Sequence, residues 1–160
     1  MAISLSRFVV IVVCVILFVA PDVRSQLITI NNNLVFGAIF PGVPKTITKY
    51  TAGAAAEFQI TGTAGSELAI DFALPTYMVT TTGFNIAMVF QETDVSVDNR
   101  AIPDQSIPQK DNLNPWQTIL DTLGASGTRI WLGGQAIPRQ VQPPGSYSAT
   151  IVLTVTYTGN

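Results

Sequence analysis

The last sixteen residues, Gly145 to Asn160, constrain the fold of this chain more than any other segment, because their apolar and polar side chains alternate. In an extended strand, the polar side would carry Ser148 and four threonines, and only Val152 breaks the alternation. The apolar side would carry Tyr147, Ala149, Ile151, Leu153, Val155 and Tyr157. A period of two residues predicts a half-buried β-strand. A strand this long needs a neighbouring strand or a protected edge.

The rest of the chain repeats short apolar segments separated by Gly, Pro, Asn and Thr, which predicts an all-β fold. We expect strands at residues 27–30, 34–40, 46–51, 56–61, 68–74, 84–90, 128–132, 135–138 and 147–157. This number and spacing favour an immunoglobulin-like β-sandwich of about seven to nine strands, with a closed barrel as the alternative.

Residues 95–127 are richer in Asp, Asn, Gln and Pro than their surroundings, so we expect a long surface loop there. Within it, Asn114 and Pro115 are typical of a helix start and Gly124 of a helix end. The apolar residues between them predict one short helix: Trp116, Ile119, Leu120 and Leu123. Because long loops often carry function, Trp116 is a candidate ligand-binding residue.

The beginning of the chain predicts export. Arg7 precedes an apolar run over residues 8–20, and Val23 and Ser25 are small enough for the two positions that signal peptidase reads. We interpret residues 1–25 as a secretory signal peptide cleaved before Gln26, with a retained membrane anchor as the alternative. The protein would then be secreted, extracellular or at the cell surface, with no membrane contact after cleavage. Residues 26–33 would form an N-terminal strand or donor arm, and residues 34–160 the β-sandwich domain.

The composition argues against catalysis. The chain contains no histidine, and its single cysteine, Cys14, lies in the predicted signal peptide. The commonest general base and a thiol nucleophile are therefore missing, so we expect neither an enzyme nor a cofactor. Residues 26–160 hold six Lys and Arg against nine Asp and Glu, a net charge of −3 that argues against nucleic-acid binding. The acidic residues between Glu92 and Asp104 leave calcium binding open.

Five short motifs connect the chain to a known family. They are Phe36-Gly37, Phe58 to Gly62, Leu74-Pro75, Gly133-Gly134 and Pro144 to Tyr147. Through them the chain resembles a secreted bacterial family, the domain of unknown function 4402. Residues 95–123 are longer and richer in proline than that family's pattern, which leaves any binding there in doubt. The terminal strand is also similar to those of spore-coat-protein-U-like and chaperone-usher fimbrial subunits. This second similarity implies an immunoglobulin-like fold whose groove is filled by the N-terminal strand of a neighbouring subunit.

We therefore expect a non-catalytic structural subunit of an extracellular filament, pilus or surface coat, which polymerises by β-strand exchange. The donor strand would present Leu27, Ile28 and Ile30. The acceptor strand would present Tyr147, Ile151, Leu153, Val155 and Tyr157. Partners would be copies of the same chain and a secretion chaperone or assembly platform.

Two alternatives stay open. The N-terminal strand would complete its own sheet if the protein were a monomer. Such a monomer would be a secreted binding module that holds a glycan or a protein with the 95–127 loop and Trp116.

Overall fold

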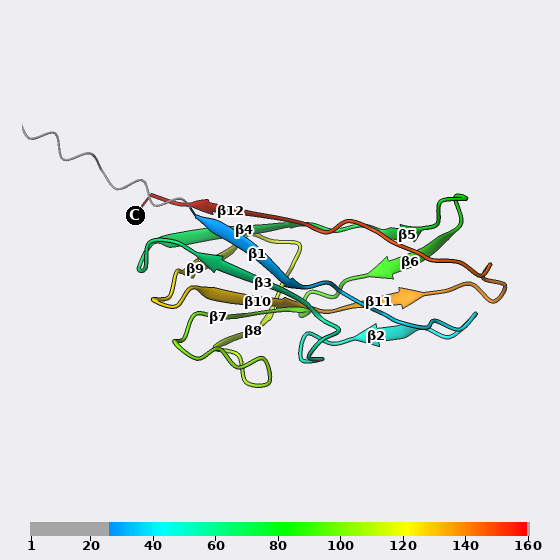
Figure 1. Cartoon of the computed structure of the whole chain (residues 1–160), viewed down its shortest axis with the longest axis horizontal. Helices are drawn as coiled ribbons and strands as arrows, with labels where there is room; N and C mark the ends of the chain where they lie inside the picture. The colour runs from blue at the N-terminus through cyan, green and yellow to red at the C-terminus, as the bar shows by residue number, and fades with distance from the viewer. Residues whose placement is uncertain (1–25, 160) are drawn as a thin grey trace, which may run out of the picture.

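The computed structural model describes residues 26–159, which form antiparallel β-sheets without any helix (Figure 1). The all-β prediction is therefore confirmed, whereas the predicted signal peptide lies outside the described residues. The twelve strands are β1 Leu27–Asn32, β2 Lys45–Ile47, β3 Ala56–Thr61, β4 Glu67–Ala73, β5 Tyr77–Val79, β6 Asn85–Val89, β7 Val95–Asp98, β8 Lys110–Leu113, β9 Ile119–Thr122, β10 Thr128–Leu132, β11 Gly134–Ile137 and β12 Val152–Tyr157. Nothing in the described part of the chain forms a helix of the length and hydrophobicity that a bilayer crossing requires.

The strands form three sheets. Five strands pair in the order β1-β3-β10-β7-β8, four in the order β2-β11-β6-β5, and three in the order β12-β4-β9. β1 lies at one edge of the first sheet, where Ile28 is opposite Ile60 of β3. β12 lies at one edge of the third sheet, where Val155 is opposite Ile70 of β4. The first and the last strand of the described residues are therefore edge strands.

One apolar core lies between the sheets. The side chains of Ile60, Leu68, Ile70, Ile130 and Leu132 have no exposed surface. The five-stranded and three-stranded sheets meet through an edge-on contact of Phe58 with Phe72, whose ring centroids are 6.2 Å apart. β10 runs into β11 through Gly133, where a Cβ atom would lie 2.7 Å from the Ile47 carbonyl oxygen. A glycine at this position lets the β2 segment pass close to the junction of β10 and β11.

The predicted helix at residues 116–123 is wrong. Asn114 does cap a turn, since its side-chain oxygen accepts a hydrogen bond from the Trp116 main-chain N–H at 2.9 Å. The chain then extends into β9 and pairs with β4. Ile119, Asp121 and Leu123 are buried while Leu120 is 66% exposed. Burial therefore alternates with a period of two, and β-branched Ile119 and Thr122 favour the strand.

The predicted loop and strand count also need correction. Residues 95–127 contain three strands that we did not expect, and β7 is wholly buried because it pairs on both sides. β5 was also missed. Residues 34–40, predicted as a strand, belong to no sheet, because no strand lies beside them. The predicted terminal strand is regular only from Val152, although Ser148 bridges to Val79.

Two leucines in one segment test the β9 assignment. Replacing Leu123, which is 1% exposed, with alanine should lower the free energy of unfolding by about 2–5 kcal/mol, because a buried cavity results. Leu120→Ala should change it by less than about 0.5 kcal/mol. Urea denaturation measures both. Equal losses would mean that the two leucines share a buried helical face.

Candidate functional site

A groove runs between two segments that are far apart in the sequence, residues 30–41 and residues 142–151. One hollow of about 700 Å³ lies between residues 34–41 and residues 142–147. A second of about 460 Å³ extends between Ile30 and residues 147–151. Leu34, Phe36, Met78 and Tyr147 line both hollows, so the two form one continuous groove. Its floor includes the buried side chains of Phe58, Ile86 and Met88.

Both walls of the groove carry main-chain groups that lack partners. Within residues 26–159, the N–H groups of residues 36–40 donate no hydrogen bond, and neither do those of residues 149–151. The nearest paired groups are Val35 N–H, which donates to the Ala54 carbonyl at 2.8 Å, and Ser148, which exchanges two hydrogen bonds with Val79. Each unpaired group favours a partner, because main-chain polar groups are obligatory hydrogen-bonding groups. The groove is therefore apolar and is bordered by N–H groups that no other group of the described chain pairs with.

The predicted acceptor residues lie partly at this groove and partly beyond it. Tyr147 and Ile151 line it. Leu153 and Val155 continue along β12 and are half-buried against the core. Tyr157 lies beyond the groove, where its hydroxyl accepts a hydrogen bond from the Thr63 main-chain N–H at 3.3 Å. The groove is thus lined by two of the five predicted residues, and the acceptor role of all five stays a prediction.

The predicted donor residues lie in the chain's own sheet. β1 pairs with β3, and its other edge faces no strand among the described residues. Ile28 is half-buried, but Leu27 is 59% and Ile30 is 63% exposed. This arrangement is the self-pairing alternative, and it leaves much of the apolar surface of β1 in water.

Sequence reasoning missed the opposite wall and the floor, above all Phe36 and Met78. A signal for the walls was present: no charged residue occurs in residues 26–44 or in residues 140–160. The residues that form the two walls, 34–41 and 142–151, lie within these charge-free segments.

Trp116 serves to anchor its own turn. Its indole N–H donates to the Phe90 carbonyl oxygen at 3.0 Å, and its ring meets the Phe90 ring edge-on. About half of the side chain remains exposed. Since neither pocket is lined by Trp116, the structure adds nothing to the proposed ligand role of this residue.

The acidic residues from Glu92 to Asp104 do not form a cluster. Among the residues with described positions, no group of three or more acidic side chains could hold a metal ion. Asp94 instead accepts a hydrogen bond from the Gln91 main-chain N–H at 2.7 Å. The calcium alternative thus has no ligand set in this part of the chain.

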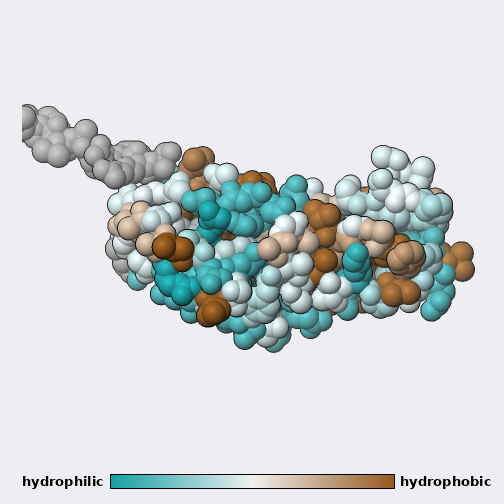
Figure 2. Space-filling view, turned by 60° about the horizontal axis from the view of Figure 1, so that its bottom comes forward, coloured by the Kyte–Doolittle hydropathy of each residue, from teal (hydrophilic) through white to brown (hydrophobic). Residues whose placement is uncertain are grey.

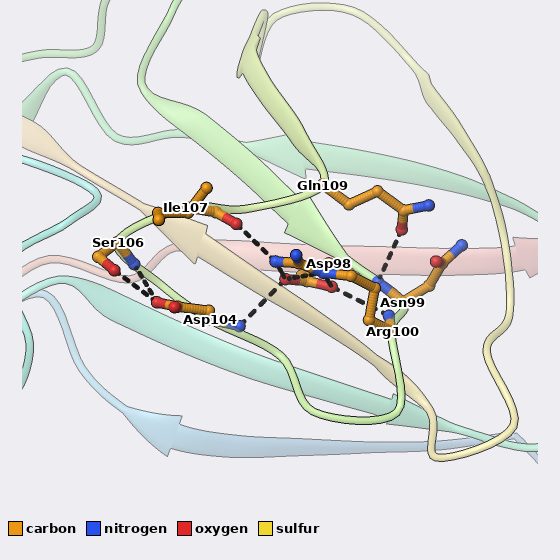
Figure 3. Close-up of polar contacts among 7 residues, drawn as sticks. All are labelled: Asp98, Asn99, Arg100, Asp104, Ser106, Ile107 and Gln109. Carbon is orange, nitrogen blue, oxygen red and sulfur yellow. Dashed lines mark hydrogen bonds and ion pairs between the residues drawn. The ribbon is translucent and has the colours of Figure 1, made fainter.

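Buried Asp98 organises the loop between β7 and β8 (Figure 3). Its carboxylate pairs with the Arg100 guanidinium and accepts hydrogen bonds from the main-chain N–H groups of Arg100 at 2.9 Å and Asp104 at 3.0 Å. Arg100 also donates to the Ile107 carbonyl oxygen. Burial alone would raise the pKa of Asp98, but these hydrogen bonds lower it from 3.8 to about 2. The loop is therefore held in one shape by a single carboxylate.

Lys49 is a second buried charge that the sequence did not reveal. Its ammonium donates to the Thr93 carbonyl at 2.6 Å, to the Asn112 side-chain oxygen at 2.8 Å and to Asp111 at 2.8 Å. Three acceptors satisfy its three protons, so Lys49 fastens the segment after β2 to β8.

The pKa of Asp98 predicts how stability depends on pH. Because the pKa is lower in the folded chain, the ionised carboxylate stabilises the fold fully above about pH 4, and this contribution disappears as the pH falls to about 2. Asp98→Asn should cost about 2 kcal/mol at pH 7, since hydrogen bonds to a charged group are lost. Urea denaturation from pH 7 to pH 2 should show the difference between the two proteins shrinking below pH 4. A constant difference would contradict the role of the charge.

Comparison with models of known protein families finds none that matches this chain, and comparison with curated proteins finds no match either. The resemblance to the domain of unknown function 4402 stays a prediction from the five motifs.

Proposed function

We propose that this chain is a non-catalytic structural subunit of an extracellular filament, pilus or surface coat, whose groove accepts one extended strand from another copy. The domain would be an immunoglobulin-like sandwich with one strand position unfilled. The observation that carries the proposal is the row of unpaired main-chain groups on both walls of an apolar groove. An added strand satisfies such groups and buries apolar side chains in the same step.

The protection of the sheet edges supports this proposal. β8 carries Lys110 and Asp111 and a register irregularity, which are devices that discourage pairing with another chain. β9 carries Asp121, which pairs with Lys110 at 2.8 Å. β1 and β12 contain no charged residue at all. The edges beside the groove are therefore the ones left able to pair.

The donor that fits best is β1 of a neighbouring copy. Its sequence from Leu27 to Ile30 is uncharged and apolar, as a neutral groove requires. In its own sheet, Ile30 stays mostly exposed at the rim of the groove. The register of β1 shifts between Ile30 and Asn32, so the pairing with β3 is already interrupted where a hinge is needed. Releasing β1 would then cost fewer contacts than releasing an inner strand.

The proposed function also requires export of the chain and a partner that protects the groove before assembly. Residues 1–25 would direct the chain to the cell exterior, and a secretion chaperone or assembly platform would cover the groove until another subunit arrives. Such cover is needed because an open apolar groove with unpaired edges promotes aggregation.

Locking β1 in its own sheet tests the donor role. Thr29 lies opposite Gln59 in the β1–β3 pair, and residues 26–160 contain no cysteine that would interfere. We expect the oxidised Thr29→Cys/Gln59→Cys protein to form no filaments in electron microscopy. Adding a reductant should restore assembly, because the disulfide alone blocks the release of β1.

Thr29→Cys alone is the matched control and should assemble with and without reductant. Filaments formed equally well by the oxidised double variant would show that β1 is not the donor.

A further inference from the structure

The charges of the subunit are divided between its two halves. Of the ten Asp and Glu residues, only Asp22 precedes residue 26, and the other nine lie at positions 57–71 and 92–121. The half built from residues 33–47, 72–91 and 134–151 contains none of them and carries Lys45 and Arg139. The other half holds four cations and nine carboxylates, a net charge of −5. The molecule is therefore positive at one end and negative over the remainder.

Ion pairing inside the acidic half makes this division sharper. Its four cations each pair with a carboxylate: Lys49 with Asp111, Arg100 with Asp98, Lys110 with Asp121 and Arg129 with Glu57. Lys45 and Arg139 form no ion pair with any described residue. Arg139 donates instead to the Asn85 side-chain oxygen at 2.9 Å. The two cations of the basic end are thus uncompensated within the described chain.

The basic end is also apolar. Phe40, Val43 and Val141 are each more than half exposed, and we call them together with Lys45 and Arg139 the basic pole. Figure 2 shows hydrophobic side chains gathered at the end of the molecule farthest from the grey trace. The two turns of this pole are joined, because the Gly42 N–H donates to the Arg139 carbonyl oxygen at 2.8 Å. A Cβ at Gly42 would lie 2.6 Å from the Gln140 side chain, so the turns are also tightly packed.

A surface of matching character lies in the acidic half. The loop between β7 and β8 exposes more than two-thirds of both Ile102 and Ile107, and Asp104 lies between them outside the ion pairs. Asp98 and Arg100 hold this loop in place, as Figure 3 shows. A loop that is already ordered loses little conformational entropy when it binds.

We propose that the basic pole of one copy binds the Ile102–Ile107 loop of the next copy. This contact joins unlike surfaces, so it repeats head to tail along a row of subunits. Its two isoleucines cover the exposed apolar side chains of the pole, while Arg139 and Lys45 approach Asp104. The contact rests on the proposed function for its biological setting, since it would orient neighbouring subunits for strand exchange.

The test uses the protein with β1 locked by the Thr29→Cys/Gln59→Cys disulfide, so that strand exchange cannot contribute. Sedimentation velocity of the secreted form should show concentration-dependent self-association that weakens between about 20 mM and 500 mM salt, because screening is stronger at high salt. Arg139→Glu and Asp104→Lys should each weaken association by about tenfold or more, as like charges then face each other. Combining the two changes in one chain should restore it, since opposite charges meet again.

Glu92→Lys is the matched control, because it changes net charge as Asp104→Lys does but lies outside the loop. It should leave association unchanged. A locked protein that stays monomeric at millimolar concentration would overturn the proposal, and so would equal effects of Glu92→Lys and Asp104→Lys. Self-association of the locked protein combined with no filaments from the unlocked protein would sustain this contact and sink the strand-exchange function.

Discussion

Unpaired main-chain groups beside an apolar groove are the constraint on which the account of this protein depends. Residues 36–40 and 149–151 form the two walls, and none of their N–H groups donates a hydrogen bond within the described chain. Water can satisfy these groups, but it cannot cover the apolar floor formed by residues such as Phe58 and Met88. A β-strand satisfies both needs, because its main chain pairs with the walls while alternate side chains enter the groove.

The placement of charged residues distinguishes the groove walls from the other sheet edges. Edges away from the groove carry ionised side chains such as Lys110 and Asp121, whereas both walls are neutral. The remaining charges separate into a basic pole and an acidic half, which gives the subunit a direction. The proposed strand exchange and the proposed contact between unlike ends would each join different surfaces of two copies, which is the head-to-tail arrangement that a row of subunits requires.

Sequence patterns predicted the regular strands of this structure better than they predicted its groove. The strands at residues 56–61 and 128–132 were predicted with the observed bounds, because their β-branched and apolar residues alternate or are wholly buried. Ile119 and Leu123 misled us, since a spacing of four residues fits both a helix and a strand. Residues 34–40 have strand-like composition, yet whether a strand finds a partner depends on its distant neighbours in the fold. For the same reason, Phe36 could not be predicted as a wall residue of the groove. The positions of Tyr147 and Ile151 in the other wall were predictable, because they belong to a segment of alternating apolar residues.

Amide hydrogen exchange at the groove walls, compared between the monomer and the assembled protein, tests the central claim most directly. In the monomer the N–H groups of residues 36–40 and 149–151 should exchange quickly, while those of β3 and β10 are protected by pairing on both sides. In the assembly both walls should become protected, because an inserted strand pairs with them. Walls that are already protected in the monomer, or that stay unprotected in the assembly, would contradict the account.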